Sequence, residues 1–80
     1  MPVKRAEKKL HKLRYWRDIA GLKQSDLAIL IGCTEQNYNM KENGNTELKR
    51  KEMLSIQGAL NEKMKKIGRD VLTLDDIFLP

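Results

Sequence analysis

Residues 32–44, with the sequence GCTEQNYNMKENG, carry an unusual concentration of side chains that form hydrogen bonds. The amide groups of Gln36, Asn37 and Asn39 each offer a donor beside an acceptor, which permits paired hydrogen bonds to the edge of an adenine. The carboxylate of Glu35 can accept a hydrogen bond from cytosine N4. Few of these side chains suit a hydrophobic core, so the stretch is typical of a recognition surface.

Residues that could support catalysis or metal binding are scarce. The chain has a single histidine, His11, and a single cysteine, Cys33, and no pair of carboxylates on a shared face completes a catalytic set. One His and one Cys do not build an ordinary zinc site, and a lone Cys leaves no internal disulfide. We therefore expect no enzyme, metal, cofactor or small-molecule substrate, with Cys33 in the core and His11 exposed.

The composition is biased towards positive charge. The 80 residues include 16 Lys and Arg against 11 Asp and Glu, which gives a net charge of +5. The length fits one small domain. The charge favours a polyanionic partner, either nucleic acid or an anionic membrane surface, although many basic domains of this size have neither. No apolar run approaches the roughly 20 residues of a membrane span, and no signal core follows the N-terminus, so we expect a cytoplasmic protein without membrane contact.

The distribution of proline and apolar residues predicts an all-helical fold. Proline occurs only at positions 2 and 80, β-branched residues are sparse, and no alternating run indicates a strand. Glycine and a capping threonine delimit three helices in the first half of the chain, over 4–20 (ending at Gly21), 23–31 (ending at Gly32) and about 35–43 (capped by Thr34).

Apolar stripes on the helices indicate the core. The inward positions are Ala6, Leu10, Leu13, Trp16 and Ala20 on the first helix, Leu27, Ala28 and Ile31 on the second, and Met53, Ile56 and Leu60 on a fourth helix expected at about 48–61. Arg17 and Gln57 share these stripes, so each needs polar partners if it is buried. Residues 61–70 either extend the fourth helix or form a loop. Thr73 and Asp76 form a capping box for a last short helix, LDDIF.

Two helices joined by a three-residue turn that begins with Gly32 give the outline of a helix-turn-helix, whose second helix enters the major groove of DNA. Residues 13–44 are similar to the Xre-like helix-turn-helix family of phage repressors and Cro proteins. The matching pieces are Arg17, GLKQ at 21–24, LA at 27–28, Gly32 and ENG at 42–44, followed by KEMLSIQGAL at the family's spacing. The resemblance covers about residues 10–60. It implies an all-α, lambda-repressor-like bundle of about five short helices.

The resemblance also implies roles for individual residues. Arg17 is expected to pair with Glu42 and tie the first helix to the third; the alternative is two solvated surface charges. The positions that would read bases are Glu35, Gln36, Asn37, Asn39 and Met40. For Glu35, a role as a favourable acid at a helix N-terminus remains equally open. Gln24 would contact phosphate and brace the reading helix, with further phosphate contacts expected from Lys23, Lys41, Asn43, Lys49, Arg50 and Lys51.

Several positions depart from the family pattern. Lys23 stands where many members have a Thr or Ser cap, so the second helix should start less well. Lys41 stands where many members have a large apolar residue. Tyr38 is expected to turn its ring inward with its hydroxyl near the backbone, and Gln57 replaces a usual alanine.

These features predict a sequence-specific, DNA-binding transcriptional regulator of phage repressor or Cro type in a bacterial or phage-infected cell. Double-stranded DNA is the expected partner, with a homodimer as one option for assembly. Residues 1–80 would form one domain, with a motif core at 13–60 and an extension at 61–80. The alternative is an antirepressor-like modulator that binds a partner repressor through the apolar tail VLTLDDIFLP. That tail could instead dock on the first and fourth helices or on a second copy, and we favour partial use of both.

Overall fold

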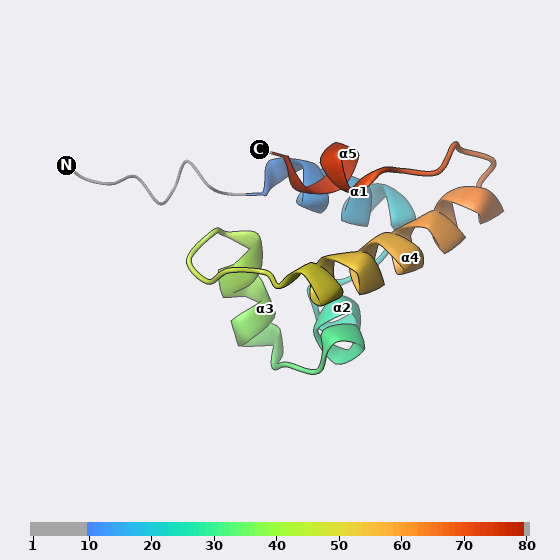
Figure 1. Cartoon of the computed structure of the whole chain (residues 1–80). Coiled ribbons are helices and arrows are strands. Elements are labelled where there is room, and N and C mark those ends of the chain that lie inside the picture. The colour runs from blue at the N-terminus through green and yellow to red at the C-terminus, as the bar shows by residue number, and fades with distance from the viewer. Residues whose placement is uncertain (1–9, 80) are drawn as a thin grey trace.

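The computed structural model describes residues 10–79, which contain five helices joined by short connections (Figure 1). They are α1 (His11–Ala20), α2 (Gln24–Ile31), α3 (Glu35–Glu42), α4 (Arg50–Lys66) and α5 (Leu74–Phe78). These described residues contain no strand, so the prediction of a small all-helical bundle is confirmed. α1, α2 and α5 all contact the long helix α4, and α2 also contacts α3.

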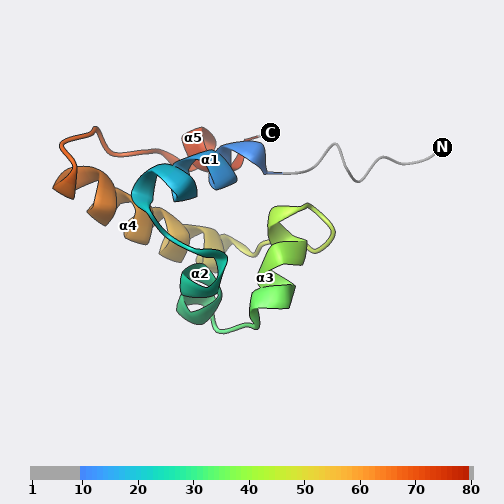
Figure 2. The same cartoon turned by 180° about the vertical axis from the view of Figure 1, so that it is seen from behind.

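The core surrounds the inner stripe of α4. Its fully buried side chains are Leu13 on α1, Leu27 on α2, Tyr38 on α3, Ile56, Leu60 and Met64 on α4, and Ile77 on α5. Partly buried apolar residues pack against them, including Leu10, Trp16, Ala20, Ile31, Cys33 and Met53. Burial of one such large apolar side chain contributes about 1.5–3 kcal/mol. In both views α1 and α5 lie above α4, α2 lies below it, and α3 stands to the side of the end where α4 begins (Figures 1 and 2).

The start of the first helix differs from the prediction. α1 begins at His11, after Leu10. The earlier part of the predicted segment, including Ala6, lies outside the described residues. The end agrees, because Gly21 adopts a left-handed conformation with φ 73° and its backbone N–H bonds back to the last turn.

The fourth helix was predicted at about 48–61. It begins two residues later, at Arg50, and continues to Lys66. Glu52 accepts the backbone N–H of Lys49 at 3.0 Å, so the helix begins after Lys49. The segment 61–66 extends the helix because Met64 continues the buried stripe of Ile56 and Leu60 at intervals of four residues. The sequence left this point open because lysines surround Met64.

Side-chain caps define the starts of the shorter helices. Thr34 Oγ1 accepts the backbone N–H of Asn37 at 3.1 Å, as predicted for α3. Lys23 gives no side-chain cap to α2, but the Asp26 carboxylate accepts the backbone N–H of Lys23 at 2.8 Å. This bond satisfies the backbone N–H of Lys23 at the helix start and offsets part of the loss of a Thr or Ser cap.

The C-terminal segment docks on α1 and α4, which is one of the two arrangements expected for it. Thr73 and Asp76 form the predicted capping box, with bonds of 3.1 and 2.9 Å. Ile77 is fully buried, whereas Leu79 is 51% exposed. Trp16 Nε1 on α1 donates to the carbonyl of Asp76 at 3.1 Å. Packing and hydrogen bonds therefore hold α5 in place.

Side-chain amides of α4 form hydrogen bonds with the segment that leads into α5. The carbonyl of Leu72 accepts from Gln57 Nε2 at 2.9 Å and from Asn61 Nδ2 at 3.1 Å. The backbone N–H of Leu72 donates to Asn61 Oδ1 at 2.6 Å. The partner that Gln57 requires is thus the backbone of the C-terminal segment. This explains an amide where the family pattern has a small apolar residue.

Candidate functional site

α2 and α3 pack against each other across the turn of residues 32–34 (Figure 1). Gly32 makes the turn with φ 78°, a left-handed conformation that glycine adopts readily. The backbone N–H of Cys33 then donates to the carbonyl of Ala28 at 2.9 Å. α3 leaves α2 with its inner side fixed by Tyr38 and Glu42, which are both buried.

α3 carries all five residues predicted to read bases. They are Glu35, Gln36, Asn37, Asn39 and Met40, and each is exposed. Met40 is the one large apolar side chain among them, with 39% exposure. α3 therefore presents amide, carboxylate and thioether groups on one short helix.

Arg17 and Glu42 form a buried, two-point ion pair between α1 and α3. Arg17 Nε donates to Glu42 Oε2 at 2.9 Å, and Nη2 donates to Oε1 at 3.2 Å. Only 8% of Arg17 and 5% of Glu42 is exposed. The alternative of two solvated surface charges is therefore wrong. The planar guanidinium matches the carboxylate in the geometry that makes such pairs strong.

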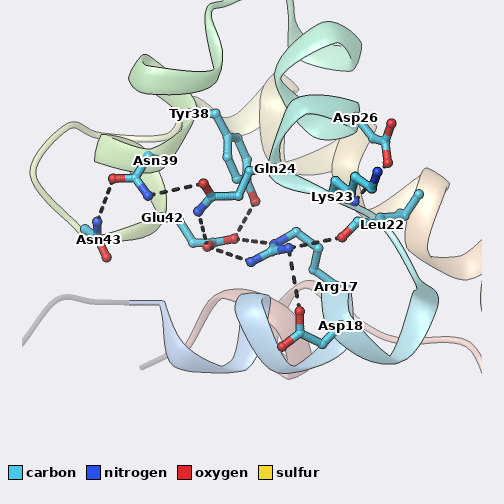
Figure 3. Close-up of polar contacts among 10 residues, drawn as sticks. All are labelled: Arg17, Asp18, Leu22, Lys23, Gln24, Asp26, Tyr38, Asn39, Glu42 and Asn43. Carbon is cyan, nitrogen blue, oxygen red and sulfur yellow. Dashed lines mark hydrogen bonds and ion pairs between the residues drawn. The ribbon is translucent and has the colours of Figure 1, made fainter.

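Further donors complete the surroundings of the pair (Figure 3). The Tyr38 hydroxyl donates to Glu42 Oε2 at 2.8 Å, and Gln24 Nε2 donates to Glu42 Oε1 at 2.9 Å. Arg17 Nη1 donates to the carbonyl of Leu22 at 3.0 Å. The ring of Tyr38 points inward as predicted, and its hydroxyl donates to the carboxylate of Glu42, a partner that the sequence had not indicated. Glu42 lies one helical turn after Tyr38, which brings the two groups together.

The network keeps its charges in place. Burial alone would raise the pKa of Glu42, but hydrogen bonds from Arg17, Gln24 and Tyr38 outweigh burial and hold that pKa below its ordinary value. Burial opposes the charge of Arg17 as well, and Glu42 reverses the effect and raises the Arg17 pKa. Burial and the charge of Glu42 raise the pKa of Tyr38. The site therefore holds a carboxylate, a guanidinium and a neutral phenol near pH 7.

A chain of amide groups links this pair to the surface of α3 (Figure 3). Gln24 Oε1 accepts from Asn39 Nδ2 at 3.2 Å, and Asn39 Oδ1 accepts from Asn43 Nδ2 at 3.0 Å. The structure thus brings one predicted base-reading residue, Asn39, together with two predicted phosphate contacts, Gln24 and Asn43. All three are oriented by Glu42.

Most of the predicted phosphate-binding cations are exposed. Lys23 precedes α2, while Lys49, Arg50 and Lys51 lie at the start of α4. None of the four forms an ion pair with another residue in the described range 10–79. Their charges are therefore available to a polyanion.

Lys41 occupies a different place from the one expected. Its Nζ lies 3.3 Å from Glu52 Oε1 and 3.3 Å from the carbonyl oxygen of Glu47, and 11% of its side chain is exposed. The ammonium group connects the end of α3 to the start of α4. Two of its three N–H donors already have protein acceptors and its charge is paired with Glu52, so Lys41 is not a candidate phosphate contact.

α1 also contributes side chains to this region, which the sequence had not indicated. A cavity of about 350 Å³, called the α1–α3 cavity below, is lined by His11, Arg14, Gln24, Asn39, Glu42 and Asn43, among others. His11 was expected only to be exposed, which it is, and Arg14 was given no role. The spacing held one signal, because Arg14 lies one helical turn before Arg17 and thus near its face of α1.

Two kinds of feature, metal-ligand clusters and membrane-spanning helices, are absent from the described part of the chain. Within it, no cluster of three or more His, Cys, Asp or Glu side chains could hold a metal ion. None of the described helices combines the length and apolar character needed to span a membrane. Comparison of the chain with protein-family models, with curated proteins and with solved structures found no match in any of the three.

Proposed function

We propose that the protein is a sequence-specific DNA-binding regulator of phage repressor or Cro type, with α3 in the major groove. One observation carries the proposal: α3 is anchored on its inner side by a buried ion pair, while its outer side presents Gln36, Asn37 and Asn39 to solvent. These exposed amides lie outside the core, to which α3 contributes Tyr38 from its inner side. They are suited to the donor and acceptor pattern of base edges.

The dimensions and chemistry of α3 support this use. An α-helix with side chains is about 10–12 Å across, and the major groove is about 12 Å wide. Gln36 and Asn37 lie in the first turn of α3, before the helix passes Tyr38. Residues near the start of a recognition helix are those that reach base edges in helix-turn-helix proteins.

Exposed cations supply the sequence-independent part of the proposed binding. Lys23 at the start of α2 and Lys49, Arg50 and Lys51 at the start of α4 belong to the two helices that adjoin α3 in sequence. Contacts of this kind fix the position of a protein on the duplex without reading the sequence. Lys41 is no longer part of this set.

The alternative of an antirepressor-like modulator depends on the C-terminal tail as a docking surface. The structure uses the central apolar residues of that tail within the chain itself, since Leu72 is 6% exposed and Ile77 is fully buried. Val71 and Leu79 stay exposed. This leaves less apolar surface for a partner, and the DNA-binding proposal has the stronger support.

Selection of bound duplexes from a random DNA pool tests the proposal, with the size of the protein and of the complex measured in parallel. We expect enrichment of one defined motif. A palindromic motif with a complex of doubled mass would indicate a homodimer on paired half-sites. Absence of enrichment, together with no binding at low salt, would contradict the proposal and favour the modulator.

A further inference from the structure

We propose that the α1–α3 cavity binds a phosphate group of the DNA backbone, held by Arg14 and by the amide groups of Asn39 and Asn43. This inference rests on the proposed DNA-binding function. It adds a contact from α1, a helix to which the sequence assigned no DNA contact. Three features of the molecule support it: the direction of the hydrogen-bond chain, the local charge and the position of the cavity.

The amide chain along the cavity has a direction that Glu42 imposes. A carboxylate only accepts hydrogen bonds, so Gln24 turns its nitrogen towards Glu42 at 2.9 Å and its oxygen towards Asn39. Asn39 must then donate from its nitrogen, at 3.2 Å, and its oxygen is left to accept from Asn43 at 3.0 Å. The reversed orientation of any one amide would place two donors or two acceptors face to face.

This direction leaves donors for a ligand. Each amide nitrogen carries two hydrogens and uses one within the chain, so Gln24, Asn39 and Asn43 each keep one N–H. Arg14 adds the several N–H groups of its guanidinium at the same cavity. A cavity with a surplus of donors matches an oxyanion, which only accepts.

The charges around the cavity favour the same ligand. The negative charge of Glu42 is matched by Arg17 at 2.9 Å, and Asp18, an exposed carboxylate on α1, lies 3.6 Å from Arg17 Nη1. Arg14 is exposed and forms no ion pair with any residue of the described range. A guanidinium binds phosphate through two parallel hydrogen bonds, and Arg14 lines the cavity without an ion pair in the described range that would compete for it.

The position of the cavity connects it to DNA. Asn39 belongs both to the outer side of α3 and to the wall of the α1–α3 cavity. A phosphate held there lies beside the groove that α3 would enter. Such a contact would carry no base preference, so its loss should weaken all DNA sequences alike.

The experiment compares the wild-type chain with Arg14→Gln, Arg14→Lys and Lys12→Gln, using a short duplex of mixed sequence at several salt concentrations. Lys12 is the matched control, because it is an exposed cation on the same helix but does not line the cavity. For Arg14→Gln we expect several-fold weaker binding and a salt slope reduced by about 0.9, the value for one lost phosphate contact. Arg14→Lys should recover part of the affinity, and Lys12→Gln should keep the wild-type slope.

Other outcomes separate this inference from the proposed function. If the wild type binds DNA and Arg14→Gln leaves the slope unchanged, or lowers it no more than Lys12→Gln does, the cavity is not a backbone contact while DNA binding stands. A parallel NMR titration with inorganic phosphate that perturbs Arg14 and Asn43, without any change of DNA slope in Arg14→Gln, would identify a free-anion site and overturn the inference. If the wild type binds no DNA at low salt, the proposed function itself fails.

Discussion

At the scale of single residues, the Arg17–Glu42 pair is the feature with the largest consequences. Two charges in a small core are tolerated because every acceptor position around Glu42 is used: by Arg17, Gln24 and Tyr38. In the described residues no buried side-chain nitrogen or oxygen lacks a hydrogen-bond partner. The pair fixes α3 on α1 and also determines which way the amide of Asn39 points.

Loss of one member of the pair should be more damaging than loss of both. Arg17→Met leaves the buried carboxylate of Glu42 without its cation, which should lower the free energy of unfolding by about 3–5 kcal/mol. The double variant Arg17→Met, Glu42→Leu removes both charges and should lose less. Urea unfolding of the two single variants and the double variant measures the coupling. Small, additive effects would contradict the buried pair, since exposed pairs contribute at most about 1 kcal/mol.

The lowered pKa of Glu42 should make the stability of the protein depend on pH. Its folded pKa lies below the ordinary value of 4.5, so the unfolded chain binds a proton more readily. This contribution to the free energy of unfolding is fully present above about pH 4.5 and is lost as the pH falls through the folded pKa. Unfolding measured against pH should therefore show a flatter acid limb in Glu42→Gln than in the wild type. An unchanged limb would mean that other carboxylates carry the acid sensitivity.

At the scale of elements, the docking of α5 shows what stabilises a five-residue helix. Such a helix is too short to form alone, and it is held by buried Ile77, by its capping box and by the bond from Trp16 to the carbonyl of Asp76. The C-terminal segment thus completes the side of the core formed by α1 and α4.

Two substitutions in neighbouring positions of this segment should differ in effect. Ile77→Ala removes a fully buried side chain and should lower the free energy of unfolding by about 2–5 kcal/mol. Leu79→Ala alters a side chain that is 51% exposed and should change it by less than about 0.5 kcal/mol. Thermal melts of both variants compare them directly. Equal effects would mean that α5 is not docked as described.

The sequence predicted those elements whose signals are local. Thr34 and Thr73 correctly indicated the starts of α3 and α5. Gly21 and Gly32 correctly indicated the ends of α1 and α2. The family resemblance supplied the Arg17–Glu42 pair. The amide chain was not predictable, because the bond from Asn39 to Gln24 joins residues 15 positions apart and depends on how α2 and α3 pack. The ion pair of Lys41 was not predictable either, because its partner Glu52 lies on another helix.

At the scale of the whole molecule, the exposed cations of α4 form two groups, one at each end of the helix. Lys49, Arg50 and Lys51 begin α4, while Lys65 and Lys66 end it. A helix of 17 residues is about 25 Å long at about 1.5 Å per residue. The far end of α4 therefore lies well away from the DNA surface proposed around α3.

This separation predicts that two lysines at opposite ends of α4 affect the salt dependence of DNA binding differently. Lys49→Gln should reduce the slope of log affinity against log salt by about 0.9, because it removes one phosphate contact. Lys65→Gln removes the same charge from the far end of α4 and should leave the slope close to that of the wild type. Titrations of one duplex at several salt concentrations compare the two. Equal reductions would indicate attraction by net charge alone.

The most direct test of the proposed reading by α3 is selection from a random DNA pool with the wild type, Gln36→Ala and Lys49→Ala. Gln36 is exposed in the first turn of α3, outside the buried network, so its replacement should leave the fold intact. We predict that Gln36→Ala relaxes the preference at one base position and weakens specific binding by about 1–3 kcal/mol, whereas Lys49→Ala weakens all sequences about equally and keeps the motif. A motif that is unchanged in Gln36→Ala would contradict the placement of Gln36 against a base edge.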